Sequence, residues 1–157
     1  MEPRARYFSL IDPHSRRVSI YNGGEIFLRE YRRTPEASRH LLTAHWCQSE
    51  VCNGGFLQFF SNSTGVLAPE AVEGFEAMGL PRLAAVVRRA LGFFERRFPR
   101  DRKERMAALG VTGGGLHLTE EQAAPFRQLD DEFFKLHETE SGGFEAAANA
   151  YAVAHGG

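Results

Sequence analysis

Apolar residues recur at helical spacing along most of the chain. The clearest case follows Pro81, where arginines occupy one side and apolar residues fall at i, i+3, i+4, i+7, i+8, i+11 and i+15 on the other. These apolar residues are Leu83, Val86, Val87, Ala90, Leu91, Phe94 and Phe98. Such spacing places the apolar side chains on one face of a helix. We therefore predict an amphipathic helix that runs from Pro81 as far as Phe98.

Helix boundaries are marked by capping residues. Thr34 before Pro35 predicts a helix start, because a threonine hydroxyl caps the first turn and proline at the first position loses no needed donor. Gly79 predicts a helix end of the Schellman type, in which a left-handed glycine lets Leu80 pack back on Phe75. Further helices are predicted near residues 7–11, 26–31, 69–79, 100–109, 126–136 and 143–154. Residues 16–21 fit either a short strand or helical turns.

Two signals precede the helix predicted over residues 126–136. Thr119 and Gln122 have the spacing of a capping box, in which each side chain bonds the backbone N–H of the other residue. Pro125 then forces a kink or a restart of the helix, because proline cannot donate to the preceding turn.

The most unusual stretch of the chain reads EVCNGGFLQFFSNSTG over residues 50–65. Asn53, Gly54 and Gly55 allow the backbone positive φ, so one helix can stop and another can start at a sharp angle. We predict a helix corner there, sealed by Phe56, with a short aromatic helix after it that points Phe59 and Phe60 inward. A turn over residues 61–65, which includes Gly65, ends that helix.

Polar residues of the corner have two interpretations. Gln58 and Asn62 lie at i and i+4 on the short helix, where they can donate to the exposed carbonyls that end the preceding helix. That reading makes the corner structural, and we favour it because buried amides usually satisfy backbone groups. The alternative is a site for a small molecule or a reaction, formed by His45, Glu50, Asn53, Gln58 and Asn62.

Composition fits one globular domain. The chain has 157 residues, of which 43% are apolar and 25% charged, which is typical of a globular protein. Together with the helical spacing along the chain, this predicts a single all-α bundle of about six to eight helices. No apolar run approaches the roughly 20 residues that span a bilayer. The N-terminal residues also lack the apolar core of a signal peptide, so we predict a cytoplasmic protein without a membrane segment.

Charge is distributed in blocks rather than evenly. The net charge is −1, but segments 1–35, 36–80, 81–105 and 106–157 carry +3, −4, +6 and −6 when lysine, arginine, aspartate and glutamate are counted. Blocks of both signs can satisfy one another within the fold or across a dimer. They do not generate one field of a single sign.

Catalytic and metal-binding patterns are weak. Cys47 and Cys52 stand at i and i+5, which places them on different faces of a helix and matches no metal or redox motif. No histidine lies at a helical neighbour position of Cys47, and a pair formed by His45 and Ser49 lacks an oxyanion hole. The glycines at 113–115 have neither the strand nor the Lys-Ser/Thr of a phosphate loop. We predict no catalytic residue, no metal and no cofactor.

Two charged segments are candidate surfaces. The acids Asp130, Asp131 and Glu132 suggest an acidic helix face offered to a basic protein partner. The basic run over residues 96–105 is interrupted by acids and carries no aromatic platform, so we interpret it as a solvated helix end rather than a nucleic-acid site.

The sequence over residues 50–65 resembles the signature of a bacterial family of helical domains named for a DNA-mimic protein. The downstream order is similar as well, with a helix ending at Gly79, an Ala/Val/Phe-rich helix, the sequence LDDEFF over 129–134 and a closing helix that contains Tyr151. The likeness covers about residues 40–155, with residues 1–33 as a helical extension packed on that region.

The resemblance implies an all-α fold and, for the named member, a dimer that presents acidic side chains like a row of phosphates. This chain differs, because 19 basic residues nearly balance 20 acidic ones. Our leading hypothesis is therefore a non-enzymatic cytoplasmic module that binds a protein partner or a second copy of itself. The rivals are the small-molecule or enzyme site above and nucleic-acid binding through residues 96–105.

Overall fold

The computed structural model describes residues 4–115 and 117–156, and within these ranges it contains helices and turns but no strand. The prediction of an all-α fold is therefore confirmed. The α-helices are α1 (Phe8–Ile11), α2 (Gly24–Arg33), α3 (Glu36–Ser61), α4 (Ala68–Ala77), α5 (Pro81–Leu91), α6 (Arg102–Ala108), α7 (Glu120–Ala123), α8 (Arg127–Thr139) and α9 (Phe144–His155).

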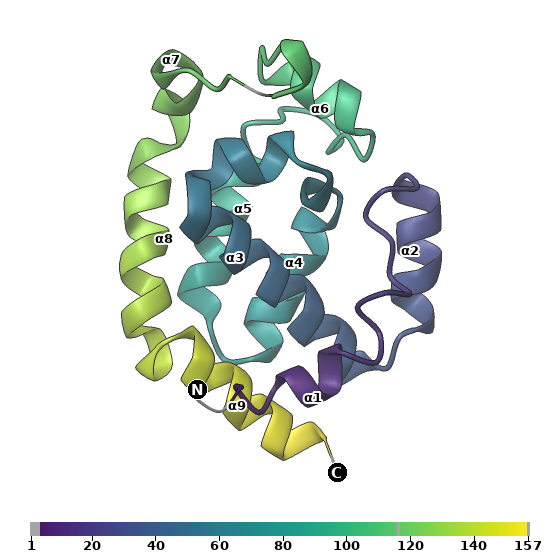
Figure 1. Cartoon of the computed structure of the whole chain (residues 1–157). Helices are drawn as coiled ribbons and strands as arrows, with labels where there is room; N and C mark the ends of the chain where they lie inside the picture. Colours follow the sequence, from purple (N-terminus) through teal and green to yellow (C-terminus); the bar gives the residue numbers. More distant parts are fainter. Residues whose placement is uncertain (1–3, 116, 157) are drawn as a thin grey trace.

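Helix α3 is the centre of the bundle. It packs against α1, α4, α6, α8 and α9, and Figure 1 shows α2 and α8 on opposite sides of the group formed by α3, α4 and α5. Gly74 of α4 allows α3 and α4 to come very close, since a Cβ atom at Gly74 would lie 2.4 Å from the carbonyl oxygen of His40. The core around these helices is rich in phenylalanine, and Phe56, Phe59, Phe60 and Phe133 are all fully buried.

Helix α5 begins at Pro81, as predicted, and the predicted Schellman motif at the end of α4 precedes it. Gly79 has φ 74°, the N–H of Leu80 donates to the carbonyl of Phe75 at 2.9 Å, and the N–H of Gly79 donates to Glu76 at 3.1 Å. These two bonds form the predicted Schellman motif. The first turn of α5 is capped from a distance, because the buried carboxylate of Glu140 accepts from the N–H groups of Arg82 and Leu83 at 2.7 and 2.8 Å.

The length predicted for this helix is wrong. Helix α5 ends at Leu91, and Phe94 and Phe98 lie in the irregular segment that follows. Gly92 weakens a helix by about 1 kcal/mol relative to alanine. Leaving the helix lets Phe94 and Phe98 meet the ring of Phe60, with centroids 5.1 and 6.1 Å away. Burial of two aromatic rings outweighs the lost helical turns.

The expected role of Thr34 is also wrong. Its hydroxyl donates to the carbonyl of Glu30 at 2.9 Å, so it ends α2 instead of capping α3. Residues 16–21 form turns and bends rather than a strand. The capping box is confirmed, because the Thr119 hydroxyl accepts from the N–H of Gln122 at 3.2 Å and the Gln122 amide accepts from Thr119 at 2.8 Å. The helix then restarts at α8, after Pro125.

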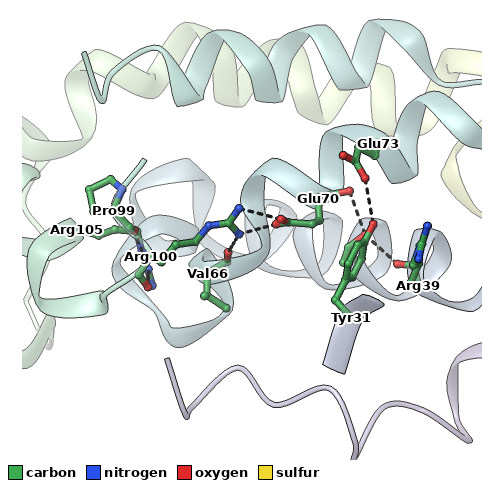
Figure 2. A network of polar contacts seen from close by, with 9 residues as sticks. Tyr31, Arg39, Val66, Glu70, Glu73, Pro99, Arg100 and Arg105 are labelled. Atoms are coloured by element: carbon green, nitrogen blue, oxygen red, sulfur yellow. Dashed lines mark hydrogen bonds and ion pairs between the residues drawn. The ribbon is translucent and has the colours of Figure 1, made fainter. Parts of the chain in front are cut away.

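A partly buried ion pair ties the segment before α6 to α4. The guanidinium of Arg100 donates to both carboxylate oxygens of Glu70, at 2.7 and 2.8 Å, and to the carbonyl of Val66 at 2.8 Å. Figure 2 shows this group beside a second one, in which the Tyr31 hydroxyl of α2 donates to Glu73 at 3.2 Å. The bidentate pair of Arg100 with Glu70 fixes geometry as well as charge and holds the segment before α6 against α4. The hydrogen bond from Tyr31 to Glu73 joins α2 to α4.

Candidate functional site

The corner lies inside α3, at the predicted glycines. Gly54 has φ −154° and ψ 15°, and Gly55 has φ 78° and ψ 179°, so the helix stops and restarts between them. The second glycine conformation is almost exclusive to glycine. A Cβ atom would also collide with neighbouring side chains, at 2.0 Å from Oε1 of Gln58 for Gly54 and 2.7 Å from Oδ2 of Asp130 for Gly55.

The helix that restarts at Phe56 is capped at its N-terminal end by a residue of α8. Oδ1 of Asp130 accepts a hydrogen bond from the N–H of Phe56 at 2.8 Å. An acid at this position satisfies a free N–H group and complements the positive end of the helix dipole. Burial raises the pKa of Asp130, while the hydrogen bond from Phe56 opposes that shift.

Two arginines of α6 cap the C-terminal end of the same short helix. Arg105 is fully buried, and its Nε and Nη2 atoms each donate at 2.9 Å, to the carbonyls of Phe60 and Asn62 respectively. Nε of Arg102 donates to the carbonyl of Ser61 at 2.7 Å. Burial lowers the pKa of Arg105 to about 10, so it stays charged at neutral pH and complements the negative end of the helix dipole.

Gly65 belongs to the same arrangement. A Cβ atom there would lie 2.8 Å from the carbonyl oxygen of Phe59 and 2.9 Å from Nε of Arg105. The family-like sequence thus contains a short helix whose two ends are capped by charges from distant segments. Sequence reasoning found the corner but missed Arg102 and Arg105, because nothing in a run of arginines distinguishes the buried member.

The polar side chains on the corner bond one another rather than the backbone. Nε2 of Gln58 and Nδ2 of Asn62 donate to Oε2 of Glu50 at 3.2 and 3.0 Å. The prediction that they bond carbonyls of the preceding helix is therefore wrong. The reason is that Glu50 points along the same side of α3 and offers a charged acceptor, which is stronger than a carbonyl.

The five residues of the alternative polar site do not converge. Glu50, Gln58 and Asn62 meet, whereas Asn53 is exposed and His45 belongs to a separate network. Nδ1 of His45 lies 2.9 Å from the Tyr7 hydroxyl and 3.5 Å from Nε2 of Gln48. Oε1 of Gln48 in turn lies 2.7 Å from Nε2 of His137. This network joins α3 to α8 and to the segment before α1.

The histidines of this bundle predict a pH-dependent stability. Burial lowers the pKa of His40, His45 and His137. The unfolded chain then binds more protons than the folded one below the unfolded pKa of about 6.5. The contribution of these histidines to the free energy of unfolding is fully present above that pH. It falls as the pH decreases, by at most about 1.4 kcal/mol per pH unit for each proton.

Urea unfolding between about pH 7.5 and 5 measures this dependence. We expect the His45→Gln variant to have a shallower slope than the natural protein. The Ser49→Ala change, at an exposed position of the same helix, removes no titratable group; it serves as the control and should leave the slope as it was. An unchanged slope in His45→Gln would contradict the claim that burial of His45 contributes to the pH dependence of stability.

The three consecutive acids of α8 face three directions, because successive residues of a helix are rotated by about 100°. Asp130 faces the corner, and Glu132 pairs with Arg89 of α5 at 2.7 Å. Asp131 lies between them and is exposed. The acids predicted as one partner surface are therefore divided, with Asp130 and Glu132 bonded inside the protein.

The basic run over residues 96–105 is divided in the same way. Arg100 and Arg105 are held by Glu70 and by backbone carbonyls, and Arg102 bonds Ser61. The members of the run that stay exposed are Arg96, Arg97 and Lys103. Half of the cations in this run thus serve the fold, so its interpretation as a solvated helix end is wrong for Arg100, Arg102 and Arg105.

The two cysteines differ in environment. Cys47 is buried and Cys52 is exposed, and neither forms a disulfide. Partial burial and the nearby carboxylate of Glu138 raise the pKa of the Cys52 thiol to about 11, so it is a weak nucleophile at neutral pH. Across the described ranges, no group of three or more His, Cys, Asp or Glu side chains is placed to hold a metal ion, and no helix there is both long and apolar enough to cross a bilayer.

These features define a class: an all-α domain built around a charge-capped Asn-Gly-Gly-Phe corner. The chain belongs to the DMP19-like protein family, which it matches over residues 32–155. This is the family of DNA-mimic proteins that the sequence resembles, and the match begins at the end of α2 and runs to the last residue of α9. Neither the curated proteins nor the solved structures contain a match to the chain.

Proposed function

We propose that the protein is a cytoplasmic interaction module without catalytic activity, and that it binds a protein partner through the outward face of α8. Membership of the DMP19-like family supports a role in protein interaction. The outward face of α8 is formed by exposed residues at helical spacing, namely Arg127, Asp131, Phe134, Lys135 and Glu138.

One observation carries the proposal: the partly exposed ring of Phe134 lies between two acids, Asp131 and Glu138, that form no ion pair within the described chain. Phe134 is 38% exposed, and it follows Asp131 by three residues and precedes Glu138 by four. In the described chain, neither acid takes part in an ion pair, whereas the neighbouring Glu132 does. Exposed aromatic side chains are typical energetic centres of interfaces, and charges around them guide orientation. The matching partner has an apolar pocket bordered by lysine or arginine.

This surface differs from a row of phosphates. Along the outward face of α8 the charges alternate in sign, from Arg127 through Asp131 and Lys135 to Glu138. Mimicry of DNA requires a sustained negative potential over a large area. We therefore propose recognition centred on Phe134, and we do not extend DNA mimicry to this chain.

Affinity capture from the cells that encode the protein tests the proposal. Capture is compared for the tagged natural protein, for the double variant Asp131→Lys/Glu138→Lys and for Phe134→Ala. We expect each variant to lose at least one captured protein, or a second copy of the chain, by about tenfold or more.

The matched control reverses two exposed acids elsewhere, Glu25→Lys on α2 and Glu104→Lys on α6. It changes the net charge by the same amount and should capture normally. Equal loss in the control, or unchanged capture by both α8 variants, would rule out this face.

A further inference from the structure

A hollow of about 240 Å³ lies beside the corner and is lined by polar groups of opposite charge. Its lining consists of Ile20, Tyr21, Glu50, Asn62, Ser63, Thr64 and Arg102. The share of liquid volume taken by one water molecule is about 30 Å³. The hollow therefore has room for about eight water molecules. A small amino acid fits into that volume.

The negative group of the hollow is the carboxylate of Glu50, which is held in place by hydrogen bonds but is not paired with a cation in the described chain. Oε2 of Glu50 accepts from the amides of Gln58 and Asn62, which fixes the carboxylate. No hydrogen bond is formed by its other oxygen in the described protein, and Glu50 takes part in no ion pair there. A fixed carboxylate with a free oxygen is a receptor for an ammonium group.

The positive group of the hollow comes from α6, whereas Glu50 belongs to α3. Arg102 is anchored by the bond from its Nε atom to the carbonyl of Ser61, at 2.7 Å, and by a longer one of 3.4 Å from Nη2 to Gly114. Its Nη1 atom takes part in no hydrogen bond in the described chain. Arg102 and Glu50 line one hollow without pairing with each other, so both charges are available to a ligand.

The remaining wall supplies hydroxyl groups. Thr64 is 9% exposed, and its hydroxyl is buried without a hydrogen-bond partner in the described protein. Buried polar groups usually have a partner. Tyr21, which is 80% exposed, stands at the mouth of the hollow, where its ring can contact a short apolar side chain.

We propose that this hollow binds a small zwitterion, of the class of free α-amino acids, with the ligand ammonium on Glu50 and its carboxylate on Arg102. The proposal goes beyond the interaction role of α8 and does not depend on it. For a ligand of this size we expect a Kd of about 1 mM.

Titration followed by NMR, with L-alanine as the probe, tests the assignment on the natural protein. Two analogues each lack one charge: L-alaninamide has no carboxylate and propionate has no ammonium. We expect each to bind at least about tenfold more weakly than alanine. Alanine at about ten times its Kd should also raise the Tm by about 3 °C.

Variants locate the site. The change Glu50→Gln keeps the size and an acceptor for Gln58 and Asn62, and it should weaken alanine binding by about tenfold or more. Glu104→Gln, an exposed change on α6, is the control and should bind alanine normally.

Four results would each overturn the proposal. They are no response to alanine, propionate binding as tightly as alanine, alaninamide binding as tightly as alanine, and unaltered alanine affinity in Glu50→Gln. The first three need no variant, so they hold even if Glu50→Gln fails to fold.

Discussion

Replacement of Arg105 by methionine is expected to lower the free energy of unfolding by about 3–5 kcal/mol, because several backbone carbonyls lose their hydrogen-bond donor. The buried guanidinium donates to the carbonyls of Phe60 and Asn62 and also to those of Arg100 and Pro99, at 2.6 and 3.2 Å. Methionine fills a similar volume but donates no hydrogen bond, so the carbonyls of Phe60, Pro99 and Arg100 lose this donor, whereas that of Asn62 keeps the N–H of Gly65 at 3.1 Å. Each unsatisfied buried group costs about 1–3 kcal/mol.

Urea unfolding monitored by circular dichroism measures this effect. For a chain of this length, the loss corresponds to a decrease in Tm of about 10 °C or more. Lys103→Met is the matched control, because Lys103 is an exposed cation on the same helix, and its change should stay within about 0.5 kcal/mol. Similar values for the two variants would show that Arg105 does not hold the corner.

The second large effect is expected at the corner glycine. Gly55→Ala should destabilise the protein by about 3 kcal/mol, since alanine is strained at φ 78° and ψ 179° by about 1–3 kcal/mol. The added Cβ atom also lies 2.7 Å from Oδ2 of Asp130 and must displace the carboxylate that caps Phe56. Loss of a cap costs about 1 kcal/mol more.

Gly79 provides the comparison for this change. It also has a positive φ, of 74°, but a Cβ atom there meets nothing within 4 Å. Gly79→Ala should therefore cost only the backbone strain, about 1 kcal/mol. Thermal unfolding of both variants compares the two positions, and equal effects would contradict both the larger strain at Gly55 and the close approach of Asp130 to it.

Periodicity and capping residues predicted most of the helices. Local signals are reliable where the whole motif lies within a few residues, as in the Schellman end at Gly79 and the capping box at Thr119. The corner was predictable for the same reason, because two adjacent glycines after a long helix permit few other structures. Prediction failed at Phe94 and Phe98, where contact with Phe60 overrides a pattern that continues in the sequence.

The candidate site was harder to predict, because its caps come from distant segments. Asp130 and Arg105 lie 74 and 45 residues from the backbone groups they bond, and a single sequence contains no signal of such pairings. The same limit explains why the prediction of one acidic surface on α8 was wrong. Three consecutive acids look like one patch in the sequence, but helix geometry gives Asp130, Asp131 and Glu132 three different neighbours.

The central claim is that the corner is a structural element held by Asp130, while the adjacent Asp131 is free for a partner. Equilibrium unfolding of Asp130→Ala and Asp131→Ala tests it most directly, since the two changes remove the same group at neighbouring positions of α8. We predict a loss of about 1–3 kcal/mol for Asp130→Ala, because the N–H of Phe56 loses its acceptor, and a change within about 0.5 kcal/mol for Asp131→Ala. Equal stabilities of the two variants, or a larger loss for Asp131→Ala, would contradict the account.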